Sequence, residues 1–189
     1  MSEQSAPNRT KTIVAIGGST RSGSSSEVLM LAVAEAVAER TGARLRTFAA
    51  EFISALPFAG TNWGSETPEQ TAFLQAAGAA DAIVLGTPAY HGGVSGLVKN
   101  ALDHLGDFEG SGGGRIAPVG VVVTGTDPLS VFNTVRAARD ISARMRGVPT
   151  PSAVAVLSKS GYQDERGRLL PEVRQQVDTV VQEIVALLK

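Results

Sequence analysis

The sequence predicts an α/β domain in which helices cover both faces of a parallel β-sheet. Three observations lead to this prediction: short apolar runs without polar interruption, longer segments of helical periodicity between them, and glycine-containing turns where the two meet. Such runs are typical of strands buried on both faces, and parallel strands need a crossover connection, most often a helix. Five strands alternating with five helices therefore predict a three-layer architecture.

The predicted elements follow one another along most of the chain. The second strand alternates in polarity, so we expect it towards a sheet edge. The stretch Ala50–Thr67 is predicted to be irregular, and Asp107–Arg115, which contains Gly110–Gly114, to be a mobile loop. Strands are expected at Thr12–Gly17, Arg44–Phe48, Ala82–Gly86, Pro118–Val123 and Ala153–Leu157. Helices are expected at Glu27–Arg40, Pro68–Ala79, Leu129–Arg146 and Glu172–Leu188, and a further helix follows Thr87–Gly93 and ends at about Leu105.

Length and composition restrict the classes of protein that fit. The 189 residues favour a single domain at 12–189 after a disordered, polar tail at 1–11. A net charge of −1 gives no basic excess for nucleic acid, and no apolar stretch suggests a signal peptide or a membrane anchor. The absence of cysteine excludes disulfides and thiolate chemistry, and two histidines make a histidine-rich metal site improbable. We therefore expect a cytoplasmic protein without a metal.

The segment Gly17–Ser26 (GGSTRSGSSS) predicts an anion site after the first strand. It leads into a helix N-terminus, where unpaired N–H groups and the helix dipole favour negative charge. Its hydroxyl groups are hydrogen-bond donors, and Arg21 supplies a guanidinium suited to phosphate. The segment lacks the lysine of a P-loop, because Ser24 stands there, and it does not match the dinucleotide fingerprint. An ordinary serine-rich N-cap is the simpler alternative.

A second informative segment, Thr87–Val94 (TPAYHGGV), follows the third strand. Because ligands of parallel sheets bind beyond the carboxyl ends of the strands, both segments are expected at the same edge. Tyr90, His91 and the glycines after them offer an aromatic ring, an imidazole and an approachable backbone to a flat ligand. Together the two segments predict a phosphate pocket beside a slot for a planar ring.

These two segments resemble the NADPH-dependent FMN reductase family of flavodoxin-like proteins. The motif G-S-x-R-x-x-S is matched from Gly18 to Ser24. The motif T-P-x-Y, followed by a small-residue turn and G-x-x-K-N, is matched from Thr87 to Asn100. The resemblance extends from Thr12 to about Leu188 and implies a flavodoxin-like three-layer sandwich with strand order 2-1-3-4-5.

The resemblance also implies a cofactor, a reaction and a site. It implies an FMN-dependent oxidoreductase that takes electrons from NADPH or NADH and passes them to a flavin, a quinone or a similar small acceptor, as a homodimer or homotetramer. The chemistry would belong to flavin N5, so no catalytic side chain is required beyond a possible contribution from His91. The sequence departs from many members at Ala89, His91 and Ser26, where glutamate or asparagine is common. The implied cofactor-binding residues are Ser19, Arg21, Ser24, Ser25 and Ser26 for the phosphate, and Pro88, Ala89, Tyr90, His91, Gly92, Thr124, Gly125 and Thr126 for the ring.

Other residues have simpler interpretations. His104 is expected to be a surface residue of a helix end, and Lys99 and Asp103 a solvated i, i+4 ion pair. Phe58 and Trp63 are expected to pack in the core or an interface, with a cover over the flavin as the alternative. Asp127 is expected to cap the helix that begins with Pro128.

Two alternatives to a reductase stay open at this stage. One is a flavin-binding electron carrier or pathway partner without NAD(P)H turnover, which the substitutions at Ala89 and His91 permit. The other is a protein that binds a phosphate ester or a nucleotide and never binds flavin.

Overall fold

The computed structural model describes residues 9–62, 64–105 and 116–188. The predictions for Trp63 and for the Gly110–Gly114 loop concern positions outside the described residues, as does segment 1–8 of the predicted tail. No helix in the described ranges is both long enough and apolar enough to cross a membrane.

A parallel sheet forms the centre of the molecule, in the order β2-β1-β3-β4-β5. This confirms the predicted order. The fifth position differs from the prediction, because two short strands share it: β5 pairs with the start of β4 and β6 pairs with its end. The strands are β1 (Thr12–Gly17), β2 (Arg44–Phe48), β3 (Ala82–Pro88), β4 (Pro118–Gly125), β5 (Val148–Pro149) and β6 (Val154–Leu157).

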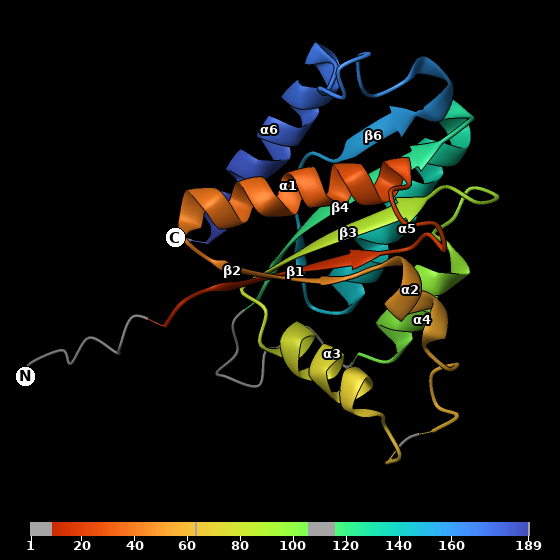
Figure 1. Ribbon diagram of the computed structural model, residues 1–189, viewed down its shortest axis with the longest axis vertical. Helices are drawn as coiled ribbons and strands as arrows, with labels where there is room; N and C mark the ends of the chain where they lie inside the picture. Colours follow the sequence, from red (N-terminus) through yellow and green to blue (C-terminus); the bar gives the residue numbers. More distant parts are fainter. Residues whose placement is uncertain (1–8, 63, 106–115, 189) are drawn as a thin grey trace, which may run out of the picture.

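Helices lie on both sides of this sheet (Figure 1). One of them, α2, falls inside the stretch predicted to be irregular, so that prediction is wrong for its first residues. This helix is short and has no side-chain cap, which leaves little helical signal in the sequence. The helices are α1 (Ser25–Thr41), α2 (Ala50–Ala55), α3 (Pro68–Gly78), α4 (Gly96–Asp103), α5 (Pro128–Arg144) and α6 (Pro171–Leu187), with a 3₁₀ turn at Ser158–Ser160.

Two apolar layers enclose the sheet. On one face, α1 and α6 pack on the sheet through fully buried residues such as Val33 and Ile184. On the other face, α3 and α4 pack on β1 and β3, and the rings of Phe48, Phe52 and Phe73 meet there with centroids 4.9–5.5 Å apart. The central strands are buried on both faces, as unbroken apolar runs predict, whereas β2 is largely exposed.

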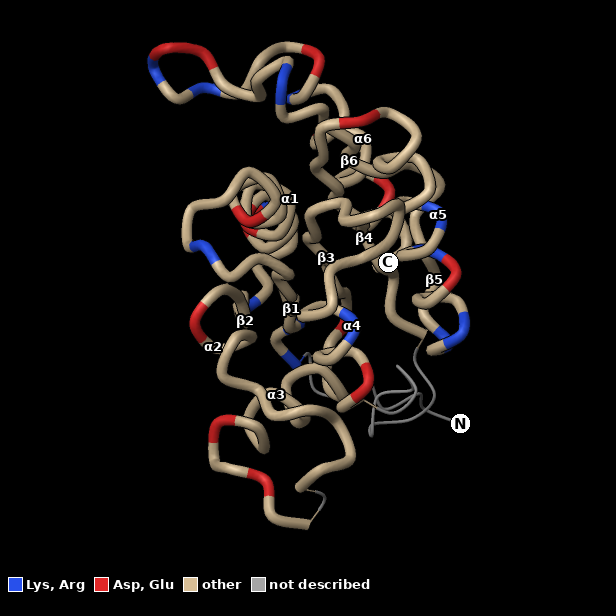
Figure 2. Tube along the Cα trace, turned by 90° about the vertical axis from the view of Figure 1, so that its right-hand side faces the viewer, with Lys and Arg blue, Asp and Glu red and all other residues tan. Residues whose placement is uncertain are grey.

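The first described residues of the chain form polar contacts at the end of the sheet where β1 begins. Arg9 pairs with Asp81 at 2.7 Å, and the backbone N–H of Thr12 donates to the same carboxylate. Lys11 donates to the carbonyl oxygen of Leu188 at 2.8 Å. Residues 9 and 11, which we assigned to the tail, therefore contact the domain. Elsewhere, positions of both charge signs are spread over the trace (Figure 2).

Candidate functional site

The loop after β1 is arranged by its own serines. Gly23 has φ +68°, a left-handed conformation that turns the chain towards α1. Ser24 then caps α1, because its Oγ accepts the N–H of Glu27 at 3.4 Å. Ser19 Oγ accepts the N–H of Arg21 at 3.1 Å, which closes a small turn before the glycine. The loop thus ends with its backbone at a helix N-terminus.

The hydroxyl groups of this loop fall into two sets. Ser24 and Ser26 are buried, and their Oγ atoms lie 3.4 Å apart, so their hydroxyl groups contact each other inside the loop. Thr20, Arg21 and Ser22 are exposed. Arg21 forms no ion pair with any residue that the structure describes. Its guanidinium is therefore available to an anion at the start of α1.

The loop after β3 contains a tight turn. The backbone N–H of Tyr90 donates to Gly93 and that of Gly93 donates to Tyr90, at 3.1 and 3.0 Å. The two central residues, His91 and Gly92, have φ values of +53° and +76°, as in a type I′ turn. Tyr90 is 59% exposed, and His91 is exposed as well. The turn presents a ring and backbone N–H groups to solvent at the sheet edge.

The three loops at this edge meet at Thr124, the next-to-last residue of β4. Ser25 Oγ donates to Thr124 Oγ1 at 3.1 Å, and the N–H of Ala89 donates to the Thr124 carbonyl oxygen at 2.7 Å. Gly125 follows with no room for a side chain, since an added Cβ would lie 2.9 Å from the Cβ of Ala89 and 2.8 Å from Val131. Segments around positions 20, 90 and 125 thus form one surface at the carboxyl ends of the strands (Figure 1).

The predicted site residues are brought together, but not all of them face outwards. Thr124 is 3% exposed, so its side chain joins loops rather than facing a ligand. Gly125 is also buried, and its carbonyl oxygen accepts from Ser158, a residue that the sequence analysis did not single out. Arg21, Tyr90, His91 and Thr126 are exposed, Ser25, Pro88, Ala89 and Gly92 are half-buried, and Ser19, Ser24 and Ser26 are buried.

A pocket of about 480 Å³ lies beside Tyr90, between the loop after β1 and the start of α4. Leu56, Phe58 and Leu97 supply apolar walls, and Phe58 is 79% exposed, which contradicts packing in the core. Asn100 holds this wall in place: its side chain donates to the carbonyl oxygen of Pro57 and accepts from the N–H of Ala59, both at 2.9 Å. The G-x-x-K-N motif contained Asn100, but its partner is visible only in the structure.

His104 has a more specific position than a surface residue of a helix end. Its Nε2 lies 2.9 Å from the carbonyl oxygen of Pro57, and the residue is half-buried. Because a carbonyl oxygen only accepts, Nε2 carries the hydrogen in this contact. Two predictions nearby are confirmed: Lys99 pairs with Asp103 at 2.6 Å, and Asp127 caps α5 by accepting from Ser130 at 2.7 Å.

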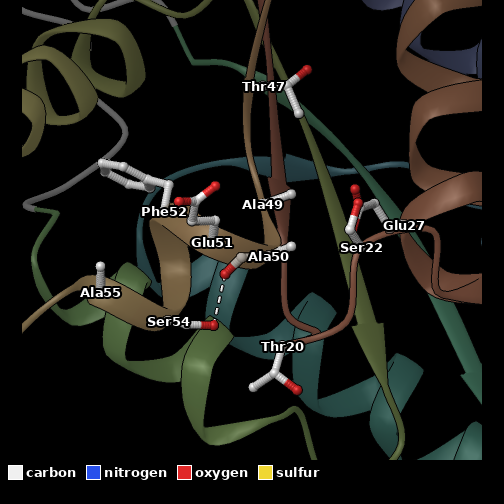
Figure 3. Close-up of a pocket in the computed structure, with 10 residues that line it drawn as sticks. All are labelled: Thr20, Ser22, Glu27, Thr47, Ala49, Ala50, Glu51, Phe52, Ser54 and Ala55. Atoms are coloured by element: carbon white, nitrogen blue, oxygen red, sulfur yellow. Dashed lines mark hydrogen bonds between the residues drawn. The ribbon is translucent and has the colours of Figure 1, made fainter.

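A second, larger groove of about 780 Å³ lies on the other side of the loop after β1. Figure 3 shows Ser22 and Glu27 on one side of the β2–α2 junction at Ala49 and Ala50, and Glu51 on the other. The Oε2 atom of Glu27 is buried and has no hydrogen-bond partner among the described residues. No local pattern in the sequence predicts this groove, since its residues come from three separate elements.

Comparison with known proteins gives one family. The family model for NADPH-dependent FMN reductase matches residues 12–161. An FMN-dependent NADPH-azoreductase of Staphylococcus aureus is 32% identical over 123 residues, which cover 61% of this chain. The match spans 60% of that relative, so the chain covers less than two thirds of it.

Solved structures with the same fold are similar over nearly the whole chain. An NADH:FMN oxidoreductase in its apo form has a TM-score of 0.78 with 21% identity, covering 95% of this chain and 91% of that chain. A flavoenzyme NAD(P)H:acceptor oxidoreductase of Paracoccus denitrificans has a TM-score of 0.68 with 20% identity, and the match covers 93% of this chain and 97% of that chain. These likenesses support the flavodoxin-like fold, and the model match over most of the sequence identifies the family. The chain belongs to the NADPH-dependent FMN reductase family.

Proposed function

We propose that this protein is an FMN-dependent NAD(P)H oxidoreductase that passes electrons from a nicotinamide cofactor through FMN to a small acceptor. The observation that carries the proposal is the meeting of three loops at Thr124, where a phosphate donor set and an exposed ring-binding turn share one edge of the sheet. Ligands of doubly wound sheets bind at such an edge, where strand order reverses between β1 and β3. Family membership supports the same cofactor.

The residues of the first loop fit the phosphate of FMN by their chemistry. Exposed Arg21 offers a planar fork without a competing carboxylate among the described residues, and Thr20 and Ser22 offer hydroxyl groups, whereas the hydroxyl of Ser25 donates to Thr124. The first N–H groups of α1 have no partner within the helix and point outwards. In this proposal Ser24 and Ser26 act indirectly, because they are buried and hold the loop in shape.

The second and third loops fit a flat ring. The Tyr90–Gly93 turn presents the N–H groups of its two left-handed residues, His91 and Gly92, as donors to an electron-rich ring edge. Ala89 keeps the adjoining surface low, since it projects only a methyl group and packs against the buried Gly125. When bound, FMN would supply the two-electron chemistry, accepting a hydride from the nicotinamide and returning the electrons to the acceptor.

The pocket beside Tyr90 supports a place for the second planar ligand. Leu56, Phe58 and Leu97 give it apolar walls, and Ser95, Asn100 and the backbone at Gly96 give it a few polar groups. A mostly apolar pocket with few polar groups suits the flat, weakly polar rings of a nicotinamide or a quinone. The proposal therefore places donor and acceptor in this pocket in turn.

An absorbance spectrum of the protein reconstituted with FMN and desalted tests the cofactor, and anaerobic addition of NADPH or NADH tests the reaction. We expect retained flavin bands that bleach with either nucleotide. A protein that retains no flavin contradicts the cofactor assignment. Flavin that stays oxidised with both nucleotides contradicts the reductase and favours an electron carrier.

The substitution Arg21→Ala tests whether Arg21 binds the phosphate of FMN. Arg21→Ala removes charge-assisted hydrogen bonds worth about 1.5–3 kcal/mol, so FMN affinity should fall at least about tenfold. Fluorescence titration measures this. Arg44→Ala is a matched control, because Arg44 is exposed at the start of β2, at the opposite end of the strands. Equal FMN affinity in Arg21→Ala and the wild type would contradict the assignment.

We also propose a homodimer, with the electron acceptor a flavin, a quinone or a similar small molecule and the cytoplasm as the location. Leu129 and Phe132 on α5 are each 66% exposed, and both lie near the site edge, one on each side of Val131. Large apolar side chains exposed together are typical of an interface. Sedimentation should give a dimer that Phe132→Glu dissociates, and an unchanged dimer in that variant would exclude this surface.

A further inference from the structure

The backbone around Phe58 is fixed to α4 by hydrogen bonds on both of its sides. The side chain of Asn100 donates to the carbonyl oxygen of Pro57 and accepts from the N–H of Ala59, both at 2.9 Å. The Nε2 atom of His104, at the end of α4, lies 2.9 Å from the same Pro57 oxygen. Two side chains from one helix therefore hold the backbone immediately before and after Phe58.

A turn fixes the backbone of Phe58 itself. Its carbonyl oxygen accepts from the N–H of Thr61 at 3.1 Å and from Thr61 Oγ1 at 2.6 Å. Gly60, at the third position of this turn, has φ +88°, as a type II turn requires. The ring nevertheless stays 79% exposed, so the fold holds the backbone of Phe58 without burying its side chain. A ring held in this way contributes little to the core and is available to a ligand.

Phe58 shares its pocket with a second exposed ring, that of Tyr90. Both residues line the pocket of about 480 Å³, and Tyr90 is 59% exposed. Leu56 and Leu97, which are half-buried, supply further apolar surface. None of the described residues that line this pocket carries a charged side chain. Two aromatic rings and uncharged, apolar walls favour a flat aromatic ligand over a compact one.

We propose that Phe58 selects a flat aromatic electron acceptor, such as a quinone with fused rings, and that Asn100 and His104 are positioning residues for its ring. The inference rests on the proposed function, since it names the class of acceptor that the same site takes. The acceptor lies against the rings of Phe58 and Tyr90, next to Thr20 in the loop that is proposed to hold the FMN phosphate. A compact acceptor without a flat ring gains no stacking contact there.

Equilibrium binding to the oxidised, FMN-loaded protein tests this selection without turnover, because a quinone takes no electrons from oxidised flavin. The probes are an anthraquinone carboxylate, which is flat, and an adamantane carboxylate, which is compact and carries the same charge. Calorimetry should show that the anthraquinone binds at least about tenfold more tightly, because only its flat face can stack on the two rings. Equal affinities for the two probes would overturn the proposal.

Substitutions of Phe58 test the role of its ring. Phe58→Ala should weaken anthraquinone binding at least about tenfold, and Phe58→Leu at least about threefold, because leucine keeps apolar surface but loses the stacking. Both variants should fold, since the side chain is exposed. Ile116→Ala is the matched control, because Ile116 is 57% exposed and is not among the described residues that line the pocket. Unchanged anthraquinone affinity in Phe58→Ala would contradict the role of the ring.

Fluorescence titration with FMN separates the acceptor from the cofactor. We expect Phe58→Ala to bind FMN as tightly as the wild type does, since the proposal places the acceptor and not the flavin against this ring. A loss of FMN affinity without a loss of anthraquinone affinity would show that Phe58 covers the flavin, and the proposal would fail.

A double-mutant cycle tests the two positioning residues. His104 is not among the described residues that line the pocket, so it can affect the acceptor only through the backbone next to Phe58. We expect Asn100→Ala and His104→Ala each to weaken anthraquinone binding at least about twofold, the effect of one hydrogen bond lost. In a Phe58→Ala background neither should weaken it further, because residues that act through one contact are not additive. Lys99→Ala is the control, since Lys99 is exposed on the same helix. No effect in the wild type, or effects that add fully to that of Phe58→Ala, would overturn the positioning roles.

The outcomes separate this inference from the proposed function. If the anthraquinone binds and Phe58→Ala weakens its binding while neither nucleotide bleaches the flavin, the role of Phe58 stands and the reductase fails. If a nucleotide bleaches the flavin but Phe58→Ala leaves the anthraquinone affinity unchanged, the reductase stands and the role of Phe58 fails.

Discussion

At the scale of single residues, His91 has a conformational role in its turn, and we propose a chemical role beside it. It occupies the first central position of the type I′ turn with φ +53°, where histidine is tolerated less well than glycine or asparagine. The turn is closed by the two hydrogen bonds between Tyr90 and Gly93, so the neighbouring backbone holds His91 in this conformation. The exposed imidazole thereby lies at the proposed ring edge.

Substitutions at His91 separate these two roles. His91→Asn should preserve stability, because asparagine adopts the left-handed region readily, whereas His91→Val should cost about 1–2 kcal/mol. Urea unfolding measures both. A chemical role of His91 predicts that kcat falls in His91→Asn although the stability of the protein is kept. An unchanged kcat would leave the residue with the turn alone.

At the scale of elements, three of the helices next to the site begin at a polar cap. Ser24 caps α1, Ser95 caps α4 with its Oγ 3.2 Å from the N–H of Val98, and Asp127 caps α5. These caps decide where the loops end, and therefore which backbone groups face the site. The N–H of Ser95 also donates to Thr87 Oγ1 at 3.0 Å, which joins the end of β3 to the start of α4.

The N-cap of α5, Asp127, should make the free energy of unfolding depend on pH in the acid range. The backbone N–H of Ser130 lowers the pKa of Asp127 below its ordinary value of 3.8, because it bonds to the charged form. The contribution is therefore complete above 3.8 and is lost as pH falls through the lowered pKa. Asp127→Asn retains a capping side chain without this ionisation. We expect wild type and variant to differ in urea midpoint near neutral pH and to converge in acid, and a difference that stays constant in acid would contradict the assignment.

At the scale of the whole molecule, close packing of α1 on the sheet positions the site. Gly86 in β3 lies directly under α1: a Cβ there would lie 2.7 Å from the Cβ of Met30 and 2.9 Å from the carbonyl oxygen of Ser26. Ser26 belongs to the first turn of α1, where the phosphate is proposed to bind. The distance between the sheet and α1 therefore also determines the geometry of the proposed anion site.

Gly86→Ala should affect both stability and cofactor binding. The added methyl group overpacks the layer, at a cost of about 1–3 kcal/mol, and moves the start of α1 outwards. Urea unfolding and FMN titration should show the two losses together. Gly96→Ala is the control, since a Cβ there meets nothing within 4 Å. A Gly86→Ala protein that loses stability but keeps full FMN affinity would show that the site does not depend on this spacing.

The sequence alone determined the strand order through its resemblance and most of the helices and strands through periodicity and caps, because these signals are local. Unbroken apolar runs marked the buried strands, and the spacing of Ser19, Arg21 and Tyr90 marked the two loops of the site. Only the tertiary structure decided which of the predicted site residues are exposed, since Thr124 is buried and bonded to Ser25 and Ala89, which are distant in the sequence. It alone revealed the groove of Glu27 and Glu51, because three elements far apart in the chain form its walls and no local pattern records their meeting.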